Sequence, residues 1–301
     1  MIIQVSKINR LSKIATLFLL TILLVSCISN RKKSLSVKGS DTMVNLTQRW
    51  AEGFMVEHPE ISVQVTGGGS GTGIASLING TSSIANISRE LKPSEINYAK
   101  QNGVNPVQHI VALDGIAVIV NPNNKVDTIS MALLKKIYSG EIKNWKSISG
   151  IDANIVLYGR ENSSGTYEYF RQSILGKNES GRQIDFPSNM QSLQGTASIA
   201  EAVSKDKYGI GFGGVGYFAL RNDIKALSIK IGNNSKAISP VVNNSIDYDA
   251  IREGVYPLSR YLYSYTNGTP KGKEKLYLDF ILSAKGQKIV ESMEYIPLIK
   301  N

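Results

Sequence analysis

Apolar residues along most of the chain follow two spacings, one typical of strands and one typical of helices. Ile61–Thr66 has an apolar residue at every second position, whereas Met43, Leu46, Trp50 and Phe54 recur as on one helix face. The same patterns predict strands at Leu35–Val37, Ile155–Tyr158 and Val107–Val120, the last with a break at Asp114–Gly115, and helices at Ile74–Ile78, at Met131–Tyr138 and around Tyr167, Phe170 and Ile174. This alternation predicts an α/β protein with largely parallel sheets.

Three of the predicted strand-to-helix turns share a composition of glycines and small hydroxyl residues. They are 38-KGSDTM-43, 67-GGGSGTGI-74 and 160-RENSSGT-166. In parallel sheets, ligands bind at the carboxyl ends of strands, where helix N-termini offer unpaired N–H groups and partial positive charge. Ser, Thr and Asp are also the preferred helix N-caps, so one such turn alone indicates capping more often than binding. Three of them, one beginning with an arginine, predict an anion site.

The N-terminal segment has the pattern of a secretory signal. Lys7, Arg10 and Lys13 precede the uncharged apolar run Ile14–Val25, which is too short to span a bilayer comfortably. The residues that end at Cys27 resemble the lipobox of bacterial lipoproteins. We therefore expect residues 1–26 to be a lipoprotein signal peptide, Cys27 to be lipidated, and residues 27–34 to be a tether. The alternative is an ordinary cleaved signal with an incidental cysteine.

Charge and cysteine content argue against a nucleic-acid binder, an internal disulfide and a metal site. The formal net charge is +10, and the leader holds three basic residues and no acidic one, so its removal leaves +7. That mild excess suits attraction of anions, but it is not the dense basic stripe of a nucleic-acid binder. Cys27 is the only cysteine, so no internal disulfide is possible, and no His/Cys cluster indicates a metal site. About 265 residues remain after leader and tether, which suffices for two lobes.

A serine hydrolase or phosphatase is the main enzymatic alternative. Ser70 and Ser164 lie in glycine-containing turns, but Thr72 and Thr166 stand at the final glycine position of G-x-S-x-G. The only histidines that could act as a base are at positions 58 and 109, where the pattern predicts a surface turn and a strand. The segment 209-GIGFGG-214 fits G-x-G-x-x-G, but no evident helix follows it, so we expect a close-packed strand. The sequence favours binding without catalysis, cofactor or metal.

A family resemblance adds to this prediction. The segments that carry it are 39-GSDTM-43, 68-GGSGTG-73, 86-NISRELK-92, 113-LDGIAVIVNP-122, 137-IYSGEIKNW-145, 159-GRENSSGT-166, 209-GIGFGG-214 and 257-PLSRYLY-263. In this order they resemble the phosphate-specific substrate-binding proteins of bacterial ABC transporters, across nearly the whole mature chain. The resemblance implies a type II periplasmic-binding-protein fold, with two α/β lobes joined by two crossover strands. It places lobe 1 at residues 35–112 plus 259–301 and lobe 2 at residues 113–258, with hinges near Leu113–Gly115 and Tyr256–Arg260.

The resemblance also implies a set of ligands for phosphate. In lobe 1 these are Thr42, the Met43 amide, Ser70 and, as a weaker candidate, Ser40; in lobe 2 they are Arg160, Ser164, Gly165 and Thr166. Known members have an aspartate at the position of Arg89, next to Ser88, and that carboxylate accepts the proton of hydrogen phosphate. An arginine cannot accept, so Asp41 or Glu161 would have to take over, and Asp41 is preferred because it lies inside a ligand turn. Alternatively, Arg89 is a surface residue paired with Glu90 or Glu95.

The expected function is high-affinity binding of inorganic phosphate outside the cytoplasmic membrane and its delivery to an ABC permease. The protein would act as a monomer, held to a bacterial membrane through its N-terminal lipid and facing the periplasm or the cell exterior. Binding of another oxyanion, such as sulfate or molybdate, is one alternative. A lipid-anchored sensor or adhesin built on the same fold is another, because fold does not dictate function.

Overall fold

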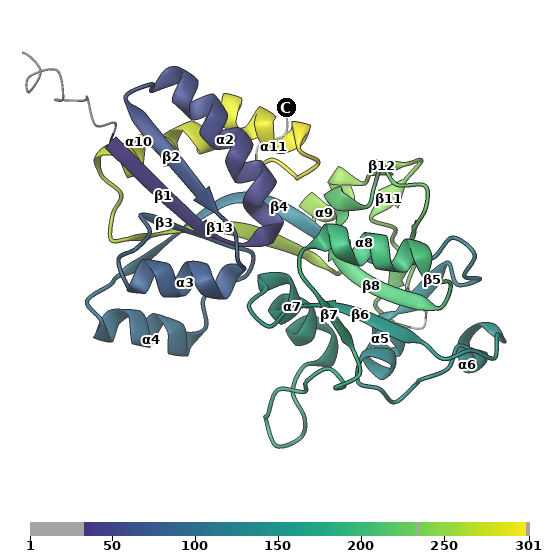
Figure 1. Ribbon diagram of the computed structural model, residues 1–301. Coiled ribbons are helices and arrows are strands. Elements are labelled where there is room, and N and C mark those ends of the chain that lie inside the picture. Colours follow the sequence, from purple (N-terminus) through teal and green to yellow (C-terminus); the bar gives the residue numbers. More distant parts are fainter. Residues whose placement is uncertain (1–32, 233, 299–301) are drawn as a thin grey trace, which may run out of the picture.

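The computed structural model describes residues 33–232 and 234–298, and it places them in two α/β lobes that share a sheet (Figure 1). The predicted signal peptide, the lipidation site Cys27 and most of the predicted tether lie outside the described residues. Within the described ranges, no helix combines the length and apolar character that a membrane crossing needs.

The N-terminal lobe is a sheet with helices on both faces (Figure 1). Its strands are β1 (Lys33–Gly39), β2 (Ile61–Thr66) and β3 (Ile84–Ile87), and its helices are the 3-10 helix η1 (Asp41–Met43), α2 (Val44–Glu57), α3 (Ser70–Ile78), α4 (Pro93–Gln101), α10 (Gly272–Leu282) and α11 (Ala284–Ser292). One core forms around α2, α10 and α11 with Trp50 and Phe54, and a second forms around α3 and α4. Because β1 runs parallel to both β2 and β3, their carboxyl ends meet at one edge.

The central lobe has a single large core. Its strands are β5 (Thr128–Ser130), β6 (Val156–Arg160), β7 (Gln191–Leu193), β8 (Gly209–Gly214), β9 (Lys225–Ala226), β10 (Ser228–Lys230), β11 (Val241–Val242) and β12 (Ser245–Ile246). Its helices are α5 (Met131–Tyr138), α6 (Lys146–Ser149), α7 (Gly165–Phe170), the π-helix η2 (Arg171–Leu175), α8 (Thr196–Lys205), the 3-10 helix η3 (Val215–Tyr217) and α9 (Tyr248–Arg252). The rings of Tyr138, Phe170 and Phe212 pack together at the centre of this core.

Two long strands, β4 (Pro106–Val120) and β13 (Ser259–Asn267), connect the lobes. The strand order is β2-β1-β3-β13-β4-β8-β6-β7, and β9 also pairs with β4. The first part of β4 runs antiparallel to β13, and residues 116–120 run antiparallel to β8. Ala112 belongs to a core of the N-terminal lobe and Leu113 to the core of the central lobe, so β4 passes from one lobe to the other at this point.

The expected elements are confirmed, with three corrections. The main sheet is mixed rather than largely parallel, because β13 runs antiparallel to β3 and β4 runs antiparallel to β13, β8 and β9. The predicted break in β4 at Asp114–Gly115 is wrong, because the strand continues and only its partner strand changes there. Asp114 is accommodated within the strand by an ion pair with Arg260. Gly115 packs against Ile251, and a Cβ on it would lie 2.7 Å from Ile251 Cδ1. Helix α3 begins at Ser70 rather than Ile74, because its first turn contains the small residues that carry no apolar signal. The segment 209–214 is the buried strand β8, as predicted.

Candidate functional site

The three donor-rich turns face one another across the gap between the lobes. Two direct contacts join turns that are far apart in the sequence: the Gly71 amide donates to the Ser163 carbonyl at 3.0 Å, and the hydroxyl oxygens of Thr42 and Thr166 lie 2.8 Å apart. Thr42 belongs to the first turn, Gly71 to the second, and Ser163 and Thr166 to the third. The three turns therefore converge on one buried point, as an anion site requires.

In the N-terminal lobe, the predicted ligands are buried and partly engaged with each other. Ser70 begins α3, and its Oγ accepts from the Ser88 amide at 3.0 Å and lies 3.2 Å from the Ser88 hydroxyl. The Met43 amide donates to the Ser40 carbonyl at 2.9 Å within η1, and the Ser40 amide donates to Asn86. Thr42 and Ser70 thus present hydroxyl groups to the meeting point, and the ligand roles of all four residues remain predictions.

In the central lobe, Ser164, Gly165 and Thr166 form the start of α7. Ser164 is the N-cap, since its Oγ accepts from the amides of Thr166 and Tyr167 at 3.2 and 3.3 Å. Capping therefore occurs, but a hydroxyl that accepts still has its own hydrogen to donate. Gly165 packs so closely on the other lobe that a Cβ there would lie 2.2 Å from Ser70 Oγ and 2.4 Å from Ser88 Oγ. Only glycine fits this contact between the lobes.

Arg160 stands at the carboxyl end of β6 with only 1% of its surface exposed. Its guanidinium donates to Glu161 through Nε at 3.1 Å and Nη2 at 2.9 Å, and Nη1 donates to the Thr196 hydroxyl at 3.2 Å. Nη2 also lies 3.4 Å from Asp41 Oδ2, on the opposite lobe. The positive charge at the site is therefore already faced by two carboxylates.

Asp41 lies inside the first ligand turn, as expected. One of its oxygens accepts from the Gly68 amide at 2.7 Å, which ties the first turn to the second, and the other faces Arg160. The Asp41 carboxylate therefore contacts both the second turn and the arginine of the third.

Arg89 is held away from the meeting point. It donates to both oxygens of Glu95, at 2.8 and 2.7 Å, and to the Glu90 carbonyl at 2.7 Å. Pairing with Glu95 was the alternative interpretation, but the side chain is buried rather than on the surface, with 9% exposure. Its charge is already matched by Glu95.

Sequence patterns missed two charged residues that lie directly behind the threonines, Arg260 on β13 and Asp114 on β4. Arg260 donates to Asp114 Oδ2 through Nε at 3.1 Å and Nη2 at 2.8 Å, and both residues are buried, with 5% and 1% exposure. Burial raises the pKa of the Asp114 carboxyl, and the Arg260 charge opposes that rise. The segments 113-LDG and 257-PLSR were part of the family resemblance, but nothing local shows that their charged side chains meet.

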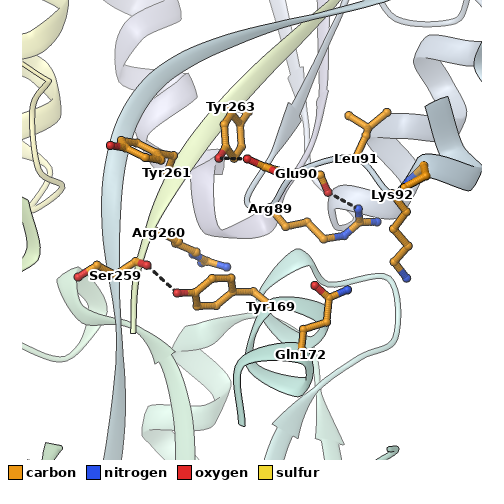
Figure 2. Close-up of a pocket in the computed structure, with 11 residues that line it drawn as sticks. Arg89, Glu90, Leu91, Lys92, Tyr169, Gln172, Ser259, Arg260, Tyr261 and Tyr263 are labelled. Carbon is orange, nitrogen blue, oxygen red and sulfur yellow. Dashed lines mark hydrogen bonds between the residues drawn. The ribbon is translucent and has the colours of Figure 1, made fainter. Parts of the chain in front are cut away.

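The Arg260 guanidinium lies over the Tyr169 ring, 5.4 Å from its centroid, and the Tyr169 hydroxyl donates to the Ser259 carbonyl at 2.6 Å (Figure 2). Arg260 and Tyr169 also line a cavity of about 460 Å³ on the Arg89 side of the cleft (Figure 2). From the C-terminal segment, the Tyr295 hydroxyl donates to the Thr42 carbonyl. The wall of the site is thus built from both lobes, both crossing strands and the C-terminal segment.

The site lacks the arrangement of a serine hydrolase. His109 Nε2 contacts the Thr266 hydroxyl at 3.0 Å on β13, and His58 packs on the ring of Phe54 at the end of α2. Ser164 caps its own helix and Ser70 contacts Ser88, so the described contacts of these serines include no histidine. Two lobes, two crossing strands and converging donors define a solute-binding protein of the two-lobed periplasmic type.

Comparisons with known proteins identify the family. Residues 28–285 match the PBP superfamily domain. The phosphate-binding protein PstS of Pseudomonas aeruginosa is 32% identical over 283 residues, 88% of this chain and 83% of that protein. PstS of Bacillus subtilis is 34% identical over 271 residues, covering 88% of this chain and 81% of that protein. A phosphate ABC transporter substrate-binding protein of Clostridium perfringens, solved with bound phosphate, is 30% identical with a TM-score of 0.73, covering 89% of this chain and 100% of that one. The chain belongs to the PstS-like substrate-binding proteins of phosphate ABC transporters, a non-enzymatic family.

Proposed function

We infer that the protein binds phosphate outside the cytoplasm and supplies it to an ABC transporter. The observation that carries this function is the meeting of hydroxyl- and glycine-rich turns from both lobes beside the buried guanidinium of Arg160. A buried phosphate dianion must exchange its hydration for hydrogen-bond donors, and arginine offers paired donors in a fixed geometry. Relatives that carry the PstS name are 32% and 34% identical to this chain, and the phosphate-bound structure has the same fold.

Eight residues make up the ligand set in this proposal. They are Ser40, Thr42, Met43, Ser70, Arg160, Ser164, Gly165 and Thr166. Hydrogen bonds to charged groups contribute roughly 1.5–3 kcal/mol each, so several of them can reach the ~8 kcal/mol of micromolar binding after desolvation and closure are subtracted. Asp41 accepts the proton of hydrogen phosphate, in place of the aspartate that the family resemblance implies at the position of Arg89, and Glu161 holds Arg160 in position.

Binding closes the cleft, and a closed form delivers the anion. The crossing strands allow a hinge near Leu113–Gly115 and Tyr256–Arg260, and contacts such as Thr42–Thr166 form only when the lobes approach. An anion that touches both lobes binds the closed form more tightly and shifts the population toward it. A permease that recognises the closed form then receives phosphate, with no covalent step. Lipid attached to Cys27 would keep the protein at the membrane.

The test is a titration of the purified mature protein with several oxyanions. We expect phosphate to raise the melting temperature and to bind with a micromolar or lower dissociation constant in calorimetry, with sulfate and molybdate bound far more weakly. If sulfate or molybdate gives the larger shift, the ligand in this proposal is wrong although the site is right. If no oxyanion shifts the melting temperature, the proposal fails as a whole.

A further inference from the structure

Arg260 donates to threonine hydroxyls of both lobes. Its Nη2 lies 2.9 Å from Thr166 Oγ1 in the central lobe and 3.4 Å from Thr42 Oγ1 in the N-terminal lobe. Its Nη1 donates to the Ser88 carbonyl at 2.9 Å. Because β13 passes between the lobes, one guanidinium can reach both threonines only when the lobes are together.

These contacts determine which way the threonine hydroxyls can point. Arginine has five N–H donors and no acceptor. One of the two Nη2 hydrogens faces Asp114, so the other is shared by the two threonine oxygens, mainly Thr166 Oγ1 and more weakly Thr42 Oγ1, and both oxygens accept. A hydroxyl has a single hydrogen, which must then point elsewhere. With the two oxygens 2.8 Å apart, one hydroxyl donates to the other in the described arrangement. An anion oxygen at this point can accept hydrogens from both.

We propose that Arg260 is a positioning residue for the anion, which fixes the hydroxyls of Thr42 and Thr166 as hydrogen donors when the lobes close. The inference rests on the proposed function, because it assigns a role within the same anion site. Arg260 acts through the threonines and does not replace Arg160 as the cation beside the ligand. Its donors reach the threonine hydroxyls, Asp114 and the Ser88 carbonyl, so none of these contacts needs a ligand.

Asp114 keeps this guanidinium in place. It stands opposite Arg260 in the antiparallel register of β4 and β13. Its Oδ2 accepts hydrogen bonds from two of the five N–H groups of Arg260. A buried arginine without a counter-ion would be strongly unfavourable, and a freely turning one could not orient two hydroxyls. The Tyr169 ring covers the guanidinium face, which limits its motion further.

The experiment removes both Asp114 and Arg260 and tests whether the resulting loss of phosphate affinity depends on the Thr166 hydroxyl. The double variant Asp114→Asn with Arg260→Met leaves no unpaired buried charge. We expect it to weaken phosphate binding about 10- to 100-fold in calorimetry. In a Thr166→Val background, which keeps the side-chain shape, the further loss should shrink to about threefold, whereas a Thr166→Ser background should retain the full loss. Arg221→Met, a change to an arginine paired with Asp223 and Glu201 on the central lobe, should leave phosphate affinity unchanged.

Equal losses in the wild-type and Thr166→Val backgrounds, or no loss in the double variant, would overturn the proposal. If the double variant does not fold, Arg260→Lys gives the answer: lysine keeps the charge against Asp114 but lacks the planar fork. It should lower phosphate affinity while the empty protein melts within a few degrees of wild type, and wild-type affinity would contradict the proposal. Failure of the unaltered protein to bind phosphate would instead reject the function itself.

Discussion

The two buried arginines of the cleft differ in how their charges are balanced. Arg160 ends a strand, and its partners Glu161 and Asp41 keep 25% and 18% of their side-chain surface exposed. Arg260 lies within β13, and its partner Asp114 is sealed at 1% exposure. Partners that reach water can move aside for an incoming anion at small cost, whereas a sealed partner cannot. This difference supports the proposal that Arg160 contacts the anion directly, whereas Arg260 stays paired with Asp114 and positions the threonines.

The strongest test of this difference is to neutralise one carboxylate of each pair. Asp114→Asn leaves the Arg260 charge buried without a counter-ion, so we expect the free energy of unfolding to fall by about 3–5 kcal/mol. Asp41→Asn removes a partly exposed partner at 3.4 Å, so the loss should be about 0–1 kcal/mol. Urea unfolding without phosphate measures both changes. Equal losses would show that the two pairs are balanced in the same way.

Removing Arg160 should lower phosphate affinity while leaving the stability of the empty protein nearly unchanged. Arg160→Ala takes away the cation of the ligand site, so phosphate affinity should fall at least about 100-fold, corresponding to roughly 3 kcal/mol. The empty protein should melt close to wild type, because Glu161 and Asp41 can turn to solvent once their partner is gone. Calorimetry and a thermal melt of the same sample separate the two effects, and Arg221→Ala is the control. A large drop in melting temperature with affinity retained would reverse the roles assigned to Arg160 and Arg260.

The same contrast explains what the sequence could predict. Arg160 follows a strand and precedes a glycine- and serine-containing turn, so its place is visible within seven residues. Arg260 and Asp114 are 146 positions apart, and only the register of β13 on β4 brings them together. The strand pattern even favoured a break at Asp114, since a charge inside an apolar run signals a turn unless its counter-ion is known. The elements that were predicted followed from apolar spacing, because that signal is local, whereas the glycine- and serine-rich first turn of α3 carries no such signal and pairing between distant strands is not local.

A smaller effect, on selectivity between phosphate and sulfate, is expected from Asp41, the carboxylate that faces Arg160 from the opposite lobe. If Asp41 accepts the proton of hydrogen phosphate, Asp41→Asn should reduce the preference for phosphate over sulfate about tenfold, because an amide can donate to fully ionised sulfate. Phosphate affinity itself should change less. Competition titrations with the two anions at neutral pH measure the ratio. Glu161→Gln is the matched comparison, since that carboxylate also contacts Arg160 but lies outside the first turn. An unchanged ratio in Asp41→Asn would show that Asp41 does not accept the phosphate proton.

The smallest effect concerns an ion pair at the rim of the cleft rather than either buried arginine. Lys92, at the start of α4, lies 2.9 Å from Glu168 on α7 and so joins the lobes, and Arg171 also contacts that carboxylate at 2.9 Å. Burial tends to raise the pKa of Glu168, but hydrogen bonds from Lys92 and Arg171 outweigh it, and the pKa is lowered. A lowered pKa in the folded state means that the stabilisation is complete above the ordinary glutamate value of about 4.3 and disappears as the pH falls through the folded value.

Glu168→Gln should therefore weaken phosphate binding no more than about threefold between pH 5 and 8, because a partly exposed pair contributes about 0–1 kcal/mol. The difference in melting temperature between wild type and Glu168→Gln should be constant over that range and vanish in more acidic solution. Glu201→Gln is the control, because its exposed pairs with Lys205 and Arg221 do not join the lobes and should not affect phosphate affinity. A loss of phosphate affinity comparable to that of Arg160→Ala would show that the Lys92–Glu168 pair, rather than the buried arginines, stabilises the closed form.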